Sequence, residues 1–204
     1  MTTKTEIRNF TIGEVEFRAP DDQPKRATGY AAVFASDSHD LGGFVERIAP
    51  GAFARSLAEA AAGTINVHAL WSHDDSQPLG STRSGKLTLS EDGHGLRFDL
   101  DITRFTPAQL DALRDGDCQM SFGFIVREQS WWESDDGTVI RTLIDVDLRE
   151  ISLVINPAYP STDAALRGMS EWRSEEICEV ERKNLDITPM LKRALSAIAR
   201  ASIG

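Results

Sequence analysis

The 204-residue sequence has little cysteine and little histidine, and it has no long apolar run. Its two cysteines, Cys118 and Cys178, lie far apart and form no Cys-x-x-Cys pair, so a disulfide framework is not expected and a reducing compartment is the default. The N-terminal segment does not have the pattern of a secretory signal, and no apolar stretch has the length of a membrane span. We therefore expect a soluble protein that is not exported.

Several common motifs are also absent. There is no Walker phosphate loop, no Gly-x-Gly-x-x-Gly and no His-Glu-x-x-His. A metal site would have to start from His39, His68, His73, Asp74 and Asp75, but these residues lack the usual ligand spacing. His68 and His73 also have opposite parity, so an unbroken strand would point them to opposite faces. We expect neither a metal ion nor an organic cofactor.

The charge balance excludes another class of partner. The chain has 22 basic and 32 acidic residues, so its formal net charge is −10, which argues against nonspecific nucleic-acid binding. Trp131 and Trp132 have side chains that can stack on bases, but the acidic balance favours a role in the core or in contact with a substrate. No nucleic acid or membrane is expected as a partner.

The sequence does contain a series of strand-like segments. Short apolar stretches separated by turns rich in Gly, Pro and Asp begin at residue 27 and continue to residue 155. They comprise residues 27–34, 44–49, 65–71, 85–90, 95–102, 119–132 and 138–155. The last two flank a Ser-Asp-Asp-Gly sequence and predict a hairpin, whereas the polar residues 73–80 predict a loop.

Two short helices are predicted between these strands. In residues 50–63, Pro50 comes early and Gly63 is a natural stop. In residues 106–116, Thr106 is a candidate N-cap, Pro107 follows at the first helical position, and Gly116 lies past the end.

These elements predict a β-rich α+β fold, with a curved sheet or closed β-barrel of about seven strands flanked by short helices. We expect three parts of the chain. Residues 1–26 form an N-terminal arm with one strand around residues 14–18, residues 27–167 form the main domain, and residues 168–204 form a helical C-terminal tail broken near Thr188-Pro189.

Three polar residues lie in or beside these apolar strands and carry complementary chemistry: His73, Ser121 and Glu150. Side chains alternate along a strand, so Ser121 and Gly123 face away from Met120, Phe122 and Phe124. By the same alternation, Glu150 and Ser152 face away from their apolar neighbours. Gly123 would leave the surface open to an approaching peptide backbone.

A hydroxyl, an imidazole and a carboxylate are the nucleophile, base and orienting acid of a serine hydrolase. Imidazole suits the role of base because its ordinary pKa lies near neutrality. Spacing alone does not show that the three side chains meet. Cys118 is a second candidate nucleophile, and the usual role of each of these residue types is merely structural.

Motifs that follow one another in a fixed order resemble those of a known family. They are GYAAVF, FVERIAPGAF, WSHDD with PLG, EDGHGLRF, MSFGF and REISLVINPAYPSTDAAL. The series resembles the HK97-type prohead (capsid maturation) serine proteases of tailed bacteriophages over residues 27–167. That family is distantly similar to the herpesvirus assembly proteases.

The resemblance implies a serine endopeptidase with a β-barrel flanked by helices. By motif, it makes His73 and Ser121 catalytic and places the acidic residue on Glu150, where herpesvirus relatives use a second histidine. Asp74 and Glu46 remain candidates for the orienting acid.

The implied substrates are the scaffolding segment of the major capsid protein and the protease itself, cleaved inside the assembling procapsid in the host cytoplasm. Two further hypotheses are self-association as a dimer and removal of the tail by self-cleavage. The competing function is that of a non-catalytic capsid scaffold or assembly factor of the same fold.

Overall fold

The structure is a computed structural model, and it describes residues 5–10, 16–18, 26–155, 165–166, 168–177 and 179. The chain divides into two compact units, residues 1–162 and 163–204. In the second unit, residues 168–177 are helical, and the expected break near Thr188-Pro189 lies outside the described residues. Among the described residues, no helix is long and apolar enough to cross a membrane.

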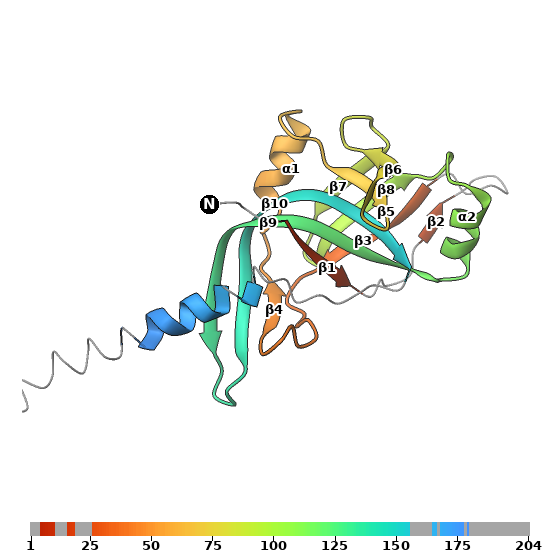
Figure 1. Cartoon of the computed structure of the whole chain (residues 1–204). Helices are drawn as coiled ribbons and strands as arrows, with labels where there is room; N and C mark the ends of the chain where they lie inside the picture. Colours follow the sequence, from red (N-terminus) through yellow and green to blue (C-terminus); the bar gives the residue numbers. More distant parts are fainter. Residues whose placement is uncertain are drawn as a thin grey trace, which may run out of the picture. The chain divides into compact units, whose positions relative to one another are not determined.

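The first unit is built from two sheets (Figure 1). Sheet A has six strands: five of them follow the order β1-β9-β10-β5-β6, and the sixth, β4, pairs with β10 outside this order. Its strands are β1 (Glu6–Phe10), β4 (Val45–Ile48), β5 (His68–Trp71), β6 (Asp74–Ser81), β9 (Cys118–Glu133) and β10 (Val139–Ile155). In the four-stranded sheet B, the order is β2-β3-β8-β7, with strands β2 (Glu16–Arg18), β3 (Arg26–Val33), β7 (Leu87–Glu91) and β8 (Gly95–Asp101).

The predicted β-rich fold class with a curved sheet is confirmed, with ten strands in the described residues. The long antiparallel hairpin of β9 and β10 runs across the unit in Figure 1 and joins β1 on one side to β5 on the other. Irregular register at Leu143–Val146 and Leu148–Glu150 bends this hairpin. The curvature follows from these bulges and the usual strand twist.

The core is apolar and draws on both sheets. Phe122 and Phe124 stack at 5.0 Å between ring centroids, and Phe53 meets Phe122 edge-on at 5.5 Å. Phe98 and Leu100 of sheet B are equally buried. Because alternate residues of each strand enter this core, the remaining residues of β9 and β10 share the other face of sheet A.

Both predicted helices are present. Helix α1 (Ala54–Ala61) begins after Phe53 and ends before Gly63, whose φ is +75°. Helix α2 (Pro107–Arg114) has the predicted N-cap: the Thr106 side chain accepts from the Gln109 N–H, and the Gln109 side chain accepts from the Thr106 N–H.

Two strands differ from the expectation. The sequence predicts a loop over residues 73–80, but residues 74–81 form β6, an antiparallel partner of β5. Most β6 side chains are not buried, so this edge strand is held by its backbone pairing and lacks the apolar alternation that marks a strand in a sequence. The N-terminal region also contributes β1 in addition to β2.

Candidate active site

The site lies on the non-core face of the β9–β10 hairpin. Across the hairpin, Ser121 is opposite Ser152, and Gly123 is opposite Glu150. Their neighbours Phe122 and Ile151 are opposite each other and buried in the core. The alternation predicted from the sequence is therefore confirmed, and it places Ser121 and Glu150 on one face.

His73 lies in a tight turn between β5 and β6. Trp71 pairs with Asp74, so Ser72 and His73 form the turn, with φ of +54° and +60°. Positive φ at both central residues is typical of a type I′ hairpin turn, which usually contains Asn and Gly. A residue other than glycine in this region costs on the order of 1 kcal/mol, and such strain is common at functional sites.

The turn is anchored to β10 by two hydrogen bonds. The Ser72 N–H donates to the Leu153 carbonyl at 2.8 Å, and the His73 N–H donates to Ser152 Oγ at 3.2 Å. The chain leaves β5 at Trp71, so the parity of an unbroken strand does not apply to His73. Its imidazole reaches the face that carries Glu150.

The imidazole is oriented by Glu150. His73 Nδ1 lies 2.6 Å from Glu150 Oε1, and both side chains are largely buried. A carboxylate only accepts hydrogen bonds, so Nδ1 carries the proton and Nε2 of the neutral ring is left with a lone pair. Nε2 is itself buried and has no hydrogen-bond partner among the described residues. A buried acceptor left unpaired costs about 1–3 kcal/mol, and it is available to take a proton from a donor brought to it.

Two further residues fix the position of the carboxylate. Ser152 Oγ donates to Glu150 Oε2 at 2.6 Å while accepting from the His73 backbone. Gly123 lies beneath the carboxylate, because a Cβ built there would be 2.5 Å from Glu150 Oε1. The space that the sequence suggests is open to a peptide is therefore occupied by Glu150.

Ser121 is on the same face but makes a different contact. It is fully buried, and its Oγ donates to the Arg8 carbonyl of β1 at 2.8 Å. Since His73 Nε2 has no partner within the described part of the chain, the serine and the histidine are not hydrogen-bonded in this state. The structure thus joins His73 to Glu150 and places Ser121 on the adjoining strand, with β1 against its hydroxyl.

Neither Asp74 nor Glu46 contacts the imidazole. Asp74 accepts from the side chains of Ser76 and Gln77 within its own exposed segment. Glu46 belongs to a buried group of two acids and two bases, here called the buried ion cluster, which consists of Glu6, Arg8, Glu46 and Arg141. Burial by itself raises the pKa of Glu6, but hydrogen bonds and charges of Arg141 and Arg8 hold the pKa below its ordinary value.

Neither a cysteine nucleophile nor a metal site gains support from the geometry. Burial, together with the nearby Asp117 charge, raises the pKa of the Cys118 thiol to about 11, so this thiol is a poor nucleophile. His68 Nε2 lies 2.7 Å from Asn66 Nδ2. Within the described part of the chain, no three His, Cys, Asp or Glu side chains gather as a metal site.

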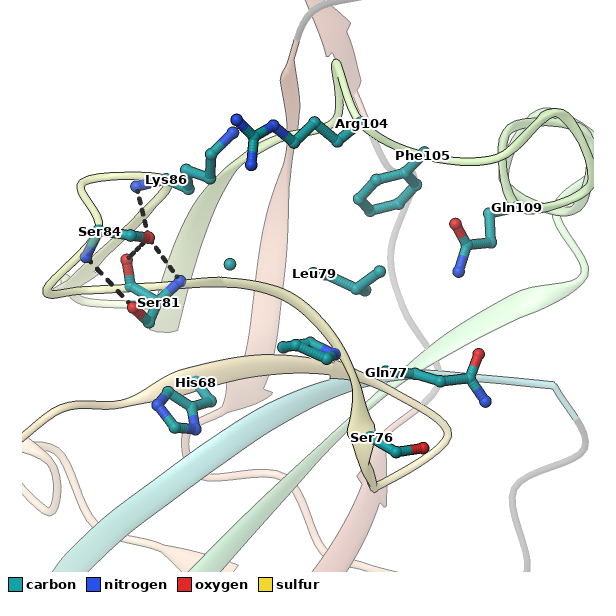
Figure 2. Close-up of a pocket in the computed structure, with 12 residues that line it drawn as sticks. His68, Ser76, Gln77, Leu79, Ser81, Ser84, Lys86, Arg104, Phe105 and Gln109 are labelled. Atoms are coloured by element: carbon teal, nitrogen blue, oxygen red, sulfur yellow. Dashed lines mark hydrogen bonds between the residues drawn. The ribbon is translucent and has the colours of Figure 1, made fainter.

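A pocket of about 470 Å³, lined by both polar and apolar side chains, opens over β6 (Figure 2). In Figure 2, Leu79 and Phe105 project toward its middle, while Lys86 and Arg104 come from one side and His68 from another. It is lined by His68, Ser76, Gln77, Pro78, Leu79, Gly80, Ser81, Ser84, Lys86, Arg104, Phe105 and Gln109. Ser121, His73 and Glu150 are not among the lining residues, so the pocket is separate from the candidate site.

The family model described as caudovirus prohead serine protease matches residues 13–175. The solved structure of the bacteriophage T4 capsid assembly protease is similar with a TM-score of 0.48 and 10% identity, over 76% of this chain and 98% of that one. No curated protein matches the chain.

Proposed function

Since the chain belongs to the caudovirus prohead serine protease family, we propose that it is a serine endopeptidase that cleaves the scaffolding segment of the major capsid protein during phage head maturation. It acts inside the assembling procapsid and also cleaves copies of itself. In this proposal Ser121 is the nucleophile, His73 is the general base, and Glu150 orients the imidazole.

The observation that carries the proposal is the pairing of His73 with Glu150. Contact of Nδ1 with Oε1 at 2.6 Å fixes the tautomer that a general base requires, with the lone pair on Nε2. The buried Nε2 atom has no partner in the residues that the structure describes, and Ser121 lies on the same face of the hairpin. A purely structural histidine would normally satisfy both ring nitrogens.

The reaction follows from these roles. Nε2 takes the Ser121 proton as Oγ bonds to the carbonyl carbon of the scissile peptide. The carbon–nitrogen bond then breaks, and the leaving amine takes the proton from the imidazolium. Water, deprotonated by the same histidine, then bonds to the acyl carbon. The bond from that carbon to Oγ breaks, Oγ takes the proton back from the imidazolium, and the acyl group leaves as a carboxylic acid. Glu150 stabilises the imidazolium while it exists, and Ser152 keeps the carboxylate in place.

The test is co-expression of the full chain with the major capsid protein of the same virus. We expect Ser121→Ala to abolish processing, as followed by mass spectrometry, with an unchanged circular dichroism spectrum. Ser130→Ala is the matched control, because Ser130 is exposed on the same strand, and it should process normally. Normal processing by Ser121→Ala would exclude Ser121 as the nucleophile, whereas capsid protein left unprocessed by the wild-type chain would favour the non-catalytic assembly role.

A further inference from the structure

Strand β1 covers the candidate nucleophile. It lies at the edge of sheet A beside β9, with Asn9 opposite Ser121 (Figure 1). The Ser121 hydroxyl gives its hydrogen to the Arg8 carbonyl at 2.8 Å, and no surface of Ser121 is exposed. While β1 is in this place, the hydroxyl cannot also donate to His73 Nε2.

The position of β1 is the position that a peptide substrate needs. Extended peptides are commonly bound as an added strand at a sheet edge, where main-chain pairing gives affinity and side-chain pockets give selectivity. β1 is extended, antiparallel to β9, and presents a main-chain carbonyl directly to Ser121. It therefore occupies the edge of β9 that a substrate strand would pair with.

Two charged side chains of β1 hold it there. Arg8 makes two hydrogen bonds to Glu46, Nε to Oε1 at 2.7 Å and Nη2 to Oε2 at 3.0 Å, and its guanidinium lies 5.6 Å from the centre of the Phe124 ring. Glu6 accepts two bonds from Arg141, at 2.8 and 2.9 Å. If β1 left this edge, Glu46 would lose its contact with Arg8, and Arg141 would lose its contact with Glu6. Another strand in the same place could then supply a base to Glu46 and an acid to Arg141.

From this geometry we propose that β1 is a resident blocker of the substrate-strand site. The strand that replaces it carries an acidic residue, any residue and then a basic residue, with the basic residue immediately before the scissile bond. The acid takes the place of Glu6 on Arg141, and the base takes the place of Arg8 on Glu46. This deepens the proposed function and rests on it, because the cleavage position assumes that Ser121 is the nucleophile.

The central test exchanges the two charges of β1 in the full-length chain, as the double substitution E6R/R8E. The composition and net charge of the chain stay the same. In this variant, however, the acid at position 8 would face Glu46 and the base at position 6 would face Arg141, so like charges should drive β1 away from the edge of β9. We expect a fluorophosphonate to label Ser121 in this variant about tenfold faster than in the wild-type chain, since loss of a buried ion pair exceeds the roughly 1.4 kcal/mol that tenfold requires.

Peptide binding tests the selectivity without any catalysis. The fluorescent peptide Thr-Glu-Ile-Arg-Asn-Phe, which copies residues 5–10, is titrated into E6R/R8E that also carries Ser121→Ala. The matched control peptide, Thr-Arg-Ile-Glu-Asn-Phe, has the same composition with the charges exchanged. We expect the first peptide to bind at least about tenfold more tightly in fluorescence anisotropy.

The outcomes separate the two proposals. Labelling of Ser121 at equal rates in both proteins, or equal binding of the two peptides, would overturn the role of β1 and leave the nucleophile intact. Absence of labelling at Ser121 in every variant, together with normal peptide selectivity, would overturn the proposed function alone. If E6R/R8E does not fold by circular dichroism, Arg8→Lys keeps the charge of residue 8 but weakens its hydrogen bonds to Glu46 and to Glu6. Labelling of that variant no faster than the wild-type chain would likewise overturn the inference.

Discussion

The candidate active site and the buried ion cluster are both polar groups on strands of sheet A, and they differ in how completely they are paired. In the buried ion cluster, Arg141 reaches Glu6, Glu46 and the Gln129 side chain, and Arg8 reaches both acids. In the candidate site, one ring nitrogen of His73 is paired with Glu150, and the other is buried and has no partner among the residues described.

This difference in pairing indicates different roles: the buried ion cluster fixes the positions of strands, and the candidate site carries out a reaction. Buried charges are stable only when their partners satisfy them, so a fully paired cluster fixes the strands that carry it. A buried acceptor left unpaired is an unfavourable arrangement that persists where the surrounding structure enforces it. The turn at Ser72–His73 and its two bonds to β10 provide that enforcement. Loss of a residue should therefore affect turnover in the candidate site and folding in the buried ion cluster.

The largest effect is expected from Glu150→Gln. An amide cannot stabilise the imidazolium and can present its NH2 to Nδ1, which selects the wrong tautomer, so kcat should fall by about 10³–10⁴-fold. Glu128→Gln is the control, because Glu128 is an exposed residue of β9, and it should retain full turnover. The measurement is steady-state cleavage of a capsid-derived peptide, with the melting temperature recorded in parallel. Unchanged kcat in Glu150→Gln would remove this carboxylate from the mechanism.

Arg141→Met should act on stability instead. It leaves the cluster with two buried carboxylates and one base, Arg8, at a cost of about 3–5 kcal/mol in the free energy of unfolding. Arg149→Met removes a guanidinium from a side chain that is 50% exposed, and should cost less than about 1 kcal/mol. Urea denaturation followed by circular dichroism measures both. An equal loss in the free energy of unfolding in the two variants would contradict the role of the cluster in fixing the strands.

A smaller effect, again on turnover, is expected from Gly123→Ala. The added Cβ would meet Glu150 Oε1 at 2.5 Å, so the carboxylate must shift and its bond to His73 lengthens. We expect kcat to fall by about 10–100-fold with KM little changed, because Gly123 positions Glu150 and does not contact the substrate. The control is Gly93→Ala, whose Cβ would meet nothing within 4 Å. A raised KM with normal kcat would instead support the peptide-contact role suggested by the sequence.

The hairpin and one face of the candidate site were predictable because apolar and polar residues alternate along β9 and β10 with the period of a strand. Strand β1 was not, because its buried residues include Glu6 and Arg8, which have the appearance of surface charges in a sequence. Only their partners Glu46 and Arg141, which are distant along the chain, explain that burial. Local pattern carries no information about such pairs.

The same limit applies to the choice of carboxylate. Glu150, Asp74 and Glu46 are all compatible with the sequence, and the decision comes from the turn that redirects His73 toward β10. Ser152 is recognisable as a neighbour of Glu150 on one strand face, but its bond to the His73 backbone depends on that turn. Left-handed φ values at Ser72 and His73 are set by the pairing of β5 with β6, which the polar sequence of β6 conceals.

The smallest effect is expected at Cys118. Thiol reagents act on the thiolate, and with the pKa of Cys118 raised to about 11, only about one thiol in three thousand is ionised at pH 7.5. Iodoacetamide should therefore change kcat by less than about twofold, and Cys118→Ala should cleave normally where Ser121→Ala does not. Inactivation in step with alkylation of Cys118, as mapped by mass spectrometry, would transfer the nucleophile to the cysteine.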